Sequence, residues 1–150
     1  MLIVGDAVCQ WVGAQLGFPV HYPLSQGVGW LQDNTIKAGL LFYDYTRQNM
    51  NVHVAFTPGF RWNPTLLAAM MDYPFNQAQV QRLTGVIPKR NIPARELADH
   101  LGAELEGEMK NATSEGDSLM IYGLQREGAS KWLTPAYQRR LESTYGKVCS

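Results

Sequence analysis

The feature that most constrains the fold is the order strand, helix, strand within residues 81–108. An apolar and largely β-branched run at residues 83–87 stops at Pro88, which predicts a strand. Asn91 then begins a helical repeat of apolar residues and Gly102 ends it. Asn can accept from the first free amides of a helix, and Gly adopts the left-handed conformation needed at a helix end. A further strand is predicted to follow at once.

The carboxyl end of this strand is a natural place for a ligand. It leads directly into a helix that Asn91 caps, and Pro93 falls in the first turn, where no backbone donor is lost. In an α/β sheet, unpaired amides and the positive end of the helix converge at such a point. The sequence therefore predicts a ligand site between Pro88 and the start of the helix.

The same residues resemble a motif of the GNAT N-acetyltransferase superfamily. In that family a strand precedes Asn-x-x-Ala-x-x-Leu-Tyr-x-x-x-Gly-Phe, and a strand that often carries Glu-Gly follows. The residues that match in register are Asn91, Ala94, Leu97, Gly102, Glu106 and Gly107. Ala98 stands where the family frequently has Tyr, its usual general acid, and Ala103 replaces Phe. The likeness covers roughly residues 26–126 and looks closest to small GNAT-like proteins of phage and prophage genomes, on the strength of Tyr73–Gln77, Arg82–Thr84 and Met120–Glu127.

The resemblance implies an α/β fold in a single domain over residues 1–150, with a mixed, mostly antiparallel central sheet flanked by helices. We expect an abbreviated amino-terminal part: a strand at 2–4, a helix at Asp6–Leu16, and a shortened remnant of a second helix at Phe18–Ser25. Strands are predicted at 27–31, 36–45 and 50–56, with Asp33-Asn34 as a turn. A helix is predicted at 65–72, broken by Tyr73-Pro74-Phe75, and the carboxyl-terminal extension from about 131 holds one more helix, at 135–143.

Composition excludes several classes of function. Thirteen basic residues balance thirteen acidic ones, so a broad electrostatic grip on nucleic acid or on an anionic membrane is not indicated, although a local basic patch stays open. No apolar run is as long as a membrane span, and the first ten residues lack a basic n-region, which predicts a cytoplasmic protein, in the host cytoplasm if phage-encoded. Cys9 and Cys149 are expected to be reduced thiols. His21 and His100 do not cluster with either cysteine at metal-ligand spacing, so no metal site is predicted.

Acetyl transfer needs a base for the amine and an acid for the departing thiolate. His53 is the candidate base, because it lies on the strand that splays open beside the thioester in this family. Asp44, between two tyrosines at the end of the preceding strand, is the candidate for placing the amine, and Tyr122 is the candidate replacement for the missing acid. Each has a structural alternative: a hydrogen-bonded histidine in the sheet, polar residues at a hairpin end, and a core aromatic.

The resemblance also implies acetyl-coenzyme A as co-substrate. The family's pyrophosphate loop, Arg/Gln-x-x-Gly-x-Gly/Ala, is absent from residues 57–63, where Gly59 and Arg61 offer a flexible backbone and a fixed positive charge instead. The cofactor-binding candidates are Gly59, Arg61, Asn63, Lys89, Asn91 and Ala94. Helix capping by Asn91 and solvent exposure of Lys89 are the structural alternatives.

The leading hypothesis is an N-acetyltransferase that uses direct attack of a primary amine, carried by a small molecule or a protein, within a ternary complex. The missing loop motif and Ala98 favour a second hypothesis, a non-catalytic GNAT-fold binding or virion-associated protein of a phage. A third is a phage enzyme that modifies a nucleobase amine, against which the neutral charge argues. A homodimer is left open, and no membrane partner is expected.

Overall fold

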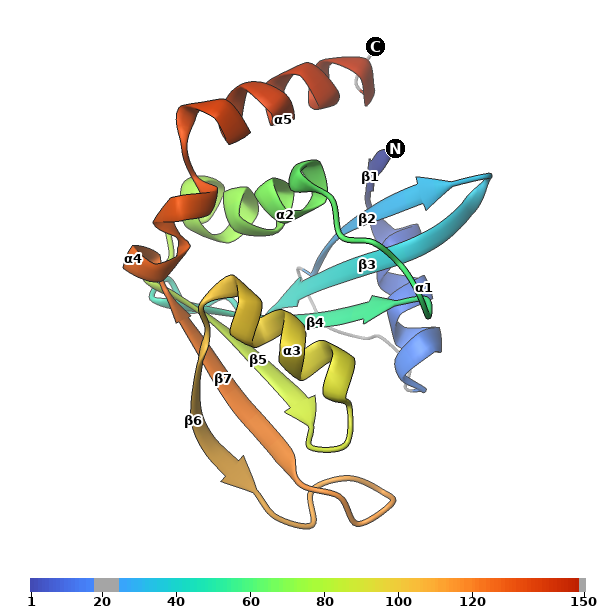
Figure 1. Ribbon diagram of the computed structural model, residues 1–150, viewed down its shortest axis with the longest axis vertical. Coiled ribbons are helices and arrows are strands. Elements are labelled where there is room, and N and C mark those ends of the chain that lie inside the picture. The colour runs from blue at the N-terminus through green and yellow to red at the C-terminus, as the bar shows by residue number, and fades with distance from the viewer. Residues whose placement is uncertain (18–24, 149–150) are drawn as a thin grey trace.

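The computed structural model describes residues 1–17 and 25–148 and contains a mixed seven-stranded sheet in these residues (Figure 1). Its strands are β1 (Leu2–Val4), β2 (Gln26–Gln32), β3 (Thr35–Tyr43), β4 (Asn49–Phe56), β5 (Arg82–Pro88), β6 (Glu104–Met109) and β7 (Leu119–Gln125). They lie in the order β1-β2-β3-β4-β5-β7-β6. Strands β4 and β5 are parallel, and the other neighbouring pairs are antiparallel. The predicted α/β fold with a mostly antiparallel sheet is confirmed.

Helices cover the sheet on both faces (Figure 1). They are α1 (Asp6–Leu16), α2 (Pro64–Met71), the π-helix η1 (Asp72–Gln77), α3 (Ile92–Leu101), α4 (Arg126–Ala129), the 3-10 helix η2 (Ser130–Trp132) and α5 (Pro135–Val148). Helix α1 packs on one face, against Leu41 and Ala55. Helices α2 and α3 contribute to the main core cluster, which includes Val52 from β4 and Leu83 from β5.

Short side chains bring α1 close to the sheet. A Cβ atom at Gly39 of β3 would lie 2.7 Å from Cγ2 of Val12, and one at Gly27 of β2 would lie 2.6 Å from the carbonyl oxygen of Gly5. Both separations are shorter than real Cβ contacts allow, so only glycine fits these positions. As a result, the end of α1 with Leu16 lies near the middle strands.

Local signals placed most elements correctly. Helix α1 and the antiparallel strands β2, β3 and β4 lie where the sequence predicts them. Asp33 and Asn34 form the predicted turn, with φ of 51° and 63°, a conformation that Asp and Asn tolerate better than most residues. The predicted helical remnant at Phe18–Ser25 falls outside the described residues except for Ser25.

The prediction that Tyr73-Pro74-Phe75 breaks the helix is wrong. The chain continues from α2 into η1, a π-helix over Asp72–Gln77. Proline clashes with the carbonyl one α-turn earlier, and the wider π-turn relieves that clash. The carboxylate of Asp72 holds the turn, because it accepts from Asn76 Nδ2 at 2.9 Å and from Gln77 Nε2 at 2.8 Å.

The carboxyl-terminal segment is part of the core. Leu141 of α5 is 1% exposed, and α5 lies along α2 (Figure 1). Indole Nε1 of Trp132 donates to the carbonyl oxygen of Leu101 at 3.2 Å. Helix α5 also runs to Val148, beyond the predicted end at 143, because no proline or capping glycine stops it there.

In the part of the chain that the structure describes, no helix has the length and apolar character to cross a membrane. Within the same residues, no group of three or more His, Cys, Asp or Glu side chains could hold a metal ion. Cys9 is a buried free thiol, and Cys149 lies outside the described residues.

Candidate functional site

Strands β4 and β5 separate part of the way along their length. Their pairing begins at Asn49 and Arg82 and ends where Val52 pairs with Gly85. Beyond that point β4 pairs with β3 alone and β5 with β7 alone. Figure 1 shows the two strands diverging, with α3 beside the opening. The backbone groups that face this opening therefore have no partner in the opposite strand.

A cavity of about 420 Å³ occupies the opening, and we call it the slot. Its walls come from both faces of the sheet. Leu16, Tyr43 and His53 line it on the α1 side, and Asn91, Ala94 and Ala98 line it on the α3 side. A Cβ atom built on Gly85 would meet no atom within 4 Å, so this glycine adds to the open space. The slot thus passes through the sheet and connects its two faces.

His53 lies in the slot as a half-buried ring stacked on Tyr43, with ring centroids 4.5 Å apart and an interplanar angle of 16°. Burial lowers the pKa of His53 to about 4, and the charge of Asp44 opposes part of that effect. The imidazole is therefore neutral at neutral pH and is a weak base. The sequence candidate lies at the opening, with its basicity reduced.

Tyr122, the candidate acid, also lines the slot. Its side chain is 3% exposed and packs with Ala98 and Met120. Arg95 Nε donates to the Tyr122 hydroxyl oxygen at 3.0 Å. The small side chain of Ala98 leaves room for the Tyr122 ring. The phenol of Tyr122 on β7 therefore lies beside position 98 of α3, where the GNAT motif frequently has a tyrosine.

Two of the six cofactor candidates lie in the slot. Asn91 and Ala94 line it, and the Asn91 side chain caps α3 by accepting from the Ala94 amide at 3.4 Å. This confirms the predicted cap.

The other four do not line the slot. Asn63 caps α2 and accepts from the Leu66 amide at 2.9 Å. Gly59 takes a left-handed φ of 79° in the loop before it, next to Arg61 in sequence. Lys89 Nζ lies 3.5 Å from Glu108 Oε2 in an exposed ion pair.

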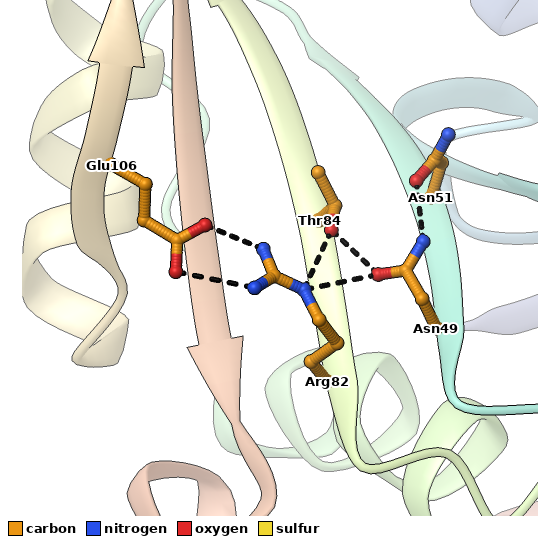
Figure 2. A network of polar contacts seen from close by, with 5 residues as sticks. All are labelled: Asn49, Asn51, Arg82, Thr84 and Glu106. Carbon is orange, nitrogen blue, oxygen red and sulfur yellow. Dashed lines mark hydrogen bonds and ion pairs between the residues drawn. The ribbon is translucent and has the colours of Figure 1, made fainter.

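A polar network that was not predicted from the sequence links residues of β4, β5 and β6 (Figure 2). Arg82 makes a bidentate pair with Glu106 at 2.6 and 3.2 Å, which holds the pKa of Glu106 below its usual range. Thr84 Oγ1 donates to Asn49 Oδ1 at 2.6 Å, and Asn49 Nδ2 donates to Asn51 Oδ1 at 2.9 Å. The alternation of polar residues at 49, 51 and 53 and at 82 and 84 was the available signal.

The absence of a side chain at Gly123 leaves space for the ion pair between Arg82 and Glu106. A Cβ atom there would lie 2.5 Å from Glu106 Oε2 and 2.6 Å from Arg82 Nη2. At the other end of the network, Asn51 Nδ2 donates to Asp44 Oδ2 at 3.4 Å. The network therefore extends along the sheet to Asp44, the residue predicted from the sequence to position the amine.

Asp44 does not line the slot. It borders a separate cavity of about 610 Å³ at the end of β3, which we call the second pocket. The second pocket is lined mainly by Phe42, Asp44, Tyr45, Met50, Tyr73 and Gln77. Tyr43 lines both cavities. The charge of Asp44 nevertheless acts on His53, whose pKa it raises against the larger effect of burial.

No protein-family model matches the sequence, and no curated protein gives a significant match. Solved structures do match. The dodecameric spermidine N-acetyltransferase of Vibrio cholerae has a TM-score of 0.68 at 11% identity, over 89% of this chain and 96% of that one. N-acetyltransferase PseH of Campylobacter jejuni, solved with acetyl coenzyme A, has a TM-score of 0.55 at 17% identity, over 68% of each chain. At such identities the likeness shows the fold alone, and the predicted GNAT-like fold is confirmed.

Proposed function

We propose that this GNAT-fold protein transfers an acetyl group from acetyl-coenzyme A to a primary amine by direct attack. The observation that carries the proposal is the slot, because it connects the two faces of the sheet between β4 and β5. A thioester held on the α3 side and an amine arriving on the α1 side would meet at one point. The solved structures of similar fold include N-acetyltransferases, which supports the same reaction class.

The residues of the slot fit the narrow arm of coenzyme A. The walls are mostly apolar, and the unpaired backbone groups of His53–Phe56 and Val86–Pro88 are suited to hydrogen bonding with the amides of the arm. Asn91 and the amino end of α3 add polar groups at its edge. We assign the phosphate end to Gly59, Arg61, Asn63 and Lys89, which follow the carboxyl ends of β4 and β5 in the chain.

In the proposed reaction the amine nitrogen attacks the thioester carbonyl carbon and the carbon–sulfur bond breaks. His53 takes the proton that the nitrogen loses, and the nearby charge of Asp44 stabilises the resulting imidazolium. Tyr122 donates its hydroxyl proton to the departing sulfur. Arg95, which already donates to the same oxygen, then faces the phenolate.

Cofactor binding is tested by thermal unfolding with acetyl-coenzyme A. A ligand that binds the folded chain raises its melting temperature by mass action, so we expect a concentration-dependent rise. Arg61→Ala should reduce the rise if this charge contacts the phosphates. No shift at millimolar acetyl-coenzyme A or coenzyme A would contradict the enzyme proposal.

The role of His53 is tested by His53→Ala. We expect turnover to fall by about two to four powers of ten, because a general base acts on the amine in the transition state. Affinity for acetyl-coenzyme A, measured by titration, should stay nearly unchanged. Near-normal turnover would return His53 to a structural role.

A non-catalytic GNAT-fold binding protein is the second candidate. The absent pyrophosphate motif and the alanine at position 98 favour it, since both remove features that the family uses for catalysis. It predicts a folded protein without a thermal shift in the cofactor titration. Kinship with phage proteins, a cytoplasmic location, a homodimer and action on nucleobases stay predictions.

A further inference from the structure

The second pocket is walled by aromatic rings that the acetyl-transfer proposal does not use. Phe42 and Tyr73 lie with ring centroids 5.0 Å apart, tilted at 50°. Tyr45 is 53% exposed, yet its hydroxyl donates to the carbonyl oxygen of Ala78 at 3.1 Å. This hydrogen bond holds the exposed Tyr45 ring in place at the border of the pocket. Aromatic rings around a carboxylate form a site that attracts cations.

Three polar side chains that line the second pocket, those of Asp44, Tyr73 and Gln77, carry oxygen atoms that can accept hydrogen bonds. Gln77 donates its amide nitrogen to Asp72, which turns its carbonyl oxygen away from that bond. Burial raises the pKa of Tyr73, so its hydroxyl stays neutral, and among the described residues it has no hydrogen-bond partner. The carboxylate of Asp44 completes the set. A ligand with several N–H donors can therefore bond to all three groups.

The charge around the pocket points the same way. Asp72 lies behind Gln77 and is 4% exposed, and its hydrogen-bond donors are the neutral amides of Asn76 and Gln77. Within residues 1–17 and 25–148, no Lys, Arg or His forms an ion pair with it. A buried carboxylate without a counter-ion is costly. A cation bound in the second pocket, beside Gln77, would offset part of that cost.

The backbone on this side is of a rare kind. Tyr73 and Gln77 both project from η1, the π-helix. Such helices are uncommon and frequently mark functional sites, because they cost stability and re-aim side chains. Here the π-turn places a ring and an amide in the lining of the pocket that Asp44 also borders.

We propose that the second pocket binds a primary alkylammonium group. Each of the three side chains can accept from one of the three N–H donors of such a group, and the aromatic walls can pack against its alkyl chain. The pocket shares Tyr43 with the slot. Resting on the acetyl transfer proposed above, the pocket then holds the ammonium group of a diamine acceptor that is not acetylated.

The test is calorimetric titration of the full chain with n-butylamine at pH 7, without acetyl-coenzyme A, at fixed low ionic strength. We expect butylammonium to bind and the neutral isostere 1-butanol not to bind. Asp44→Asn should weaken butylammonium binding on the order of tenfold, because it removes a charge-assisted hydrogen bond. The matched control is Asp33→Asn, since Asp33 is an exposed turn residue with φ of 51°, close to the 53° of Asp44. It should leave the affinity unchanged.

Ring signals of ¹³C-labelled tyrosine locate the ligand. Those of Tyr45 and Tyr73, assigned with Tyr→Phe variants, should shift, and that of Tyr122 in the slot should not. Four outcomes would each contradict the alkylammonium site. They are equal binding of butanol, equal affinity of the two Asp→Asn variants, tighter binding of n-butylguanidine, and a signal shift confined to Tyr122. None of these measurements depends on turnover. If the protein binds butylammonium but shows no thermal shift with the cofactor, the acetyl-transfer proposal is wrong and the alkylammonium-site proposal stands. If the protein acetylates amines but does not bind butylammonium, the alkylammonium-site proposal is wrong and the acetyl-transfer proposal stands.

Discussion

His53 lies half-buried at the slot, stacked on Tyr43, and burial holds its pKa at about 4. In the unfolded chain its pKa returns to about 6.5. Between these two values the unfolded chain binds the proton more tightly than the folded chain does. The contribution of His53 to the free energy of unfolding is therefore fully present above pH ~6.5 and is lost as the pH falls toward 4.

We expect His53→Gln to reduce acid sensitivity, because glutamine does not titrate. The measurement is the change in melting temperature between pH 7 and pH 5, which should be smaller in the variant than in the parent chain. His100→Gln serves as the control, since His100 is exposed on α3. An equal change in the parent and in His53→Gln would show that the imidazole is not desolvated.

Helix α3 and strand β7 fit together through one small and one large side chain. Ala98 is 8% exposed and Tyr122 is 3% exposed, and both belong to one cluster with Met120. The phenol thus occupies space beside the helix that a larger residue at position 98 would need. This complementarity belongs to the pair of elements, since neither segment shows it alone.

Ala98→Tyr should overpack this contact and destabilise the chain by about 1–3 kcal/mol. Urea unfolding measures the loss. Adding Tyr122→Ala to the same chain should return part of the stability, because it removes the competing ring, so the two changes should not be additive. Additive losses would argue that the two side chains do not compete for the same space.

Across the whole molecule, the carboxyl-terminal segment closes the main core. Leu141 of α5 and Trp132 of η2 belong to the same buried cluster as Val28 of β2 and Leu83 of β5. The segment expected as an extension from about 131 therefore buries apolar surface that the sheet and α2 would otherwise expose. Its stability is expected to be linked to that of the sheet.

Leu141→Ala should lower the free energy of unfolding by about 2–5 kcal/mol, because it opens a cavity in a core that includes the sheet. Denaturant unfolding followed by both circular dichroism and tryptophan fluorescence should give one shared transition at a lower midpoint. Glu142→Ala, an exposed neighbour on α5, is the control. Loss of α5 alone, with the sheet transition unchanged, would contradict the role in the core.

Local sequence signals correctly predict several elements of this chain. The Asn91 cap, the Gly102 stop and the Asp33-Asn34 turn are choices that a few neighbouring residues make, and the structure has all of them. The GNAT-like fold was predicted from a family resemblance, carried by the motif at Asn91, Ala94, Leu97 and Gly102 together with the order of the elements. Local signals work because caps and turns are stabilised by bonds within a few residues.

The positions of the cavities and the surroundings of each candidate residue depend on packing between distant segments. The slot exists because β4 and β5 stop pairing after Val52 and Gly85, a register that no local pattern encodes. The phenol of Tyr122 lies beside Ala98, and Asp44 borders a different cavity from His53, through packing between distant segments. The π-helix formed where proline predicted a break, because the wider turn accommodates Pro74 and the Asp72 carboxylate holds it through Asn76 and Gln77. Burial, register and charge pairing depend on the whole fold, so the sequence supplied the residue types and the fold supplied their environments.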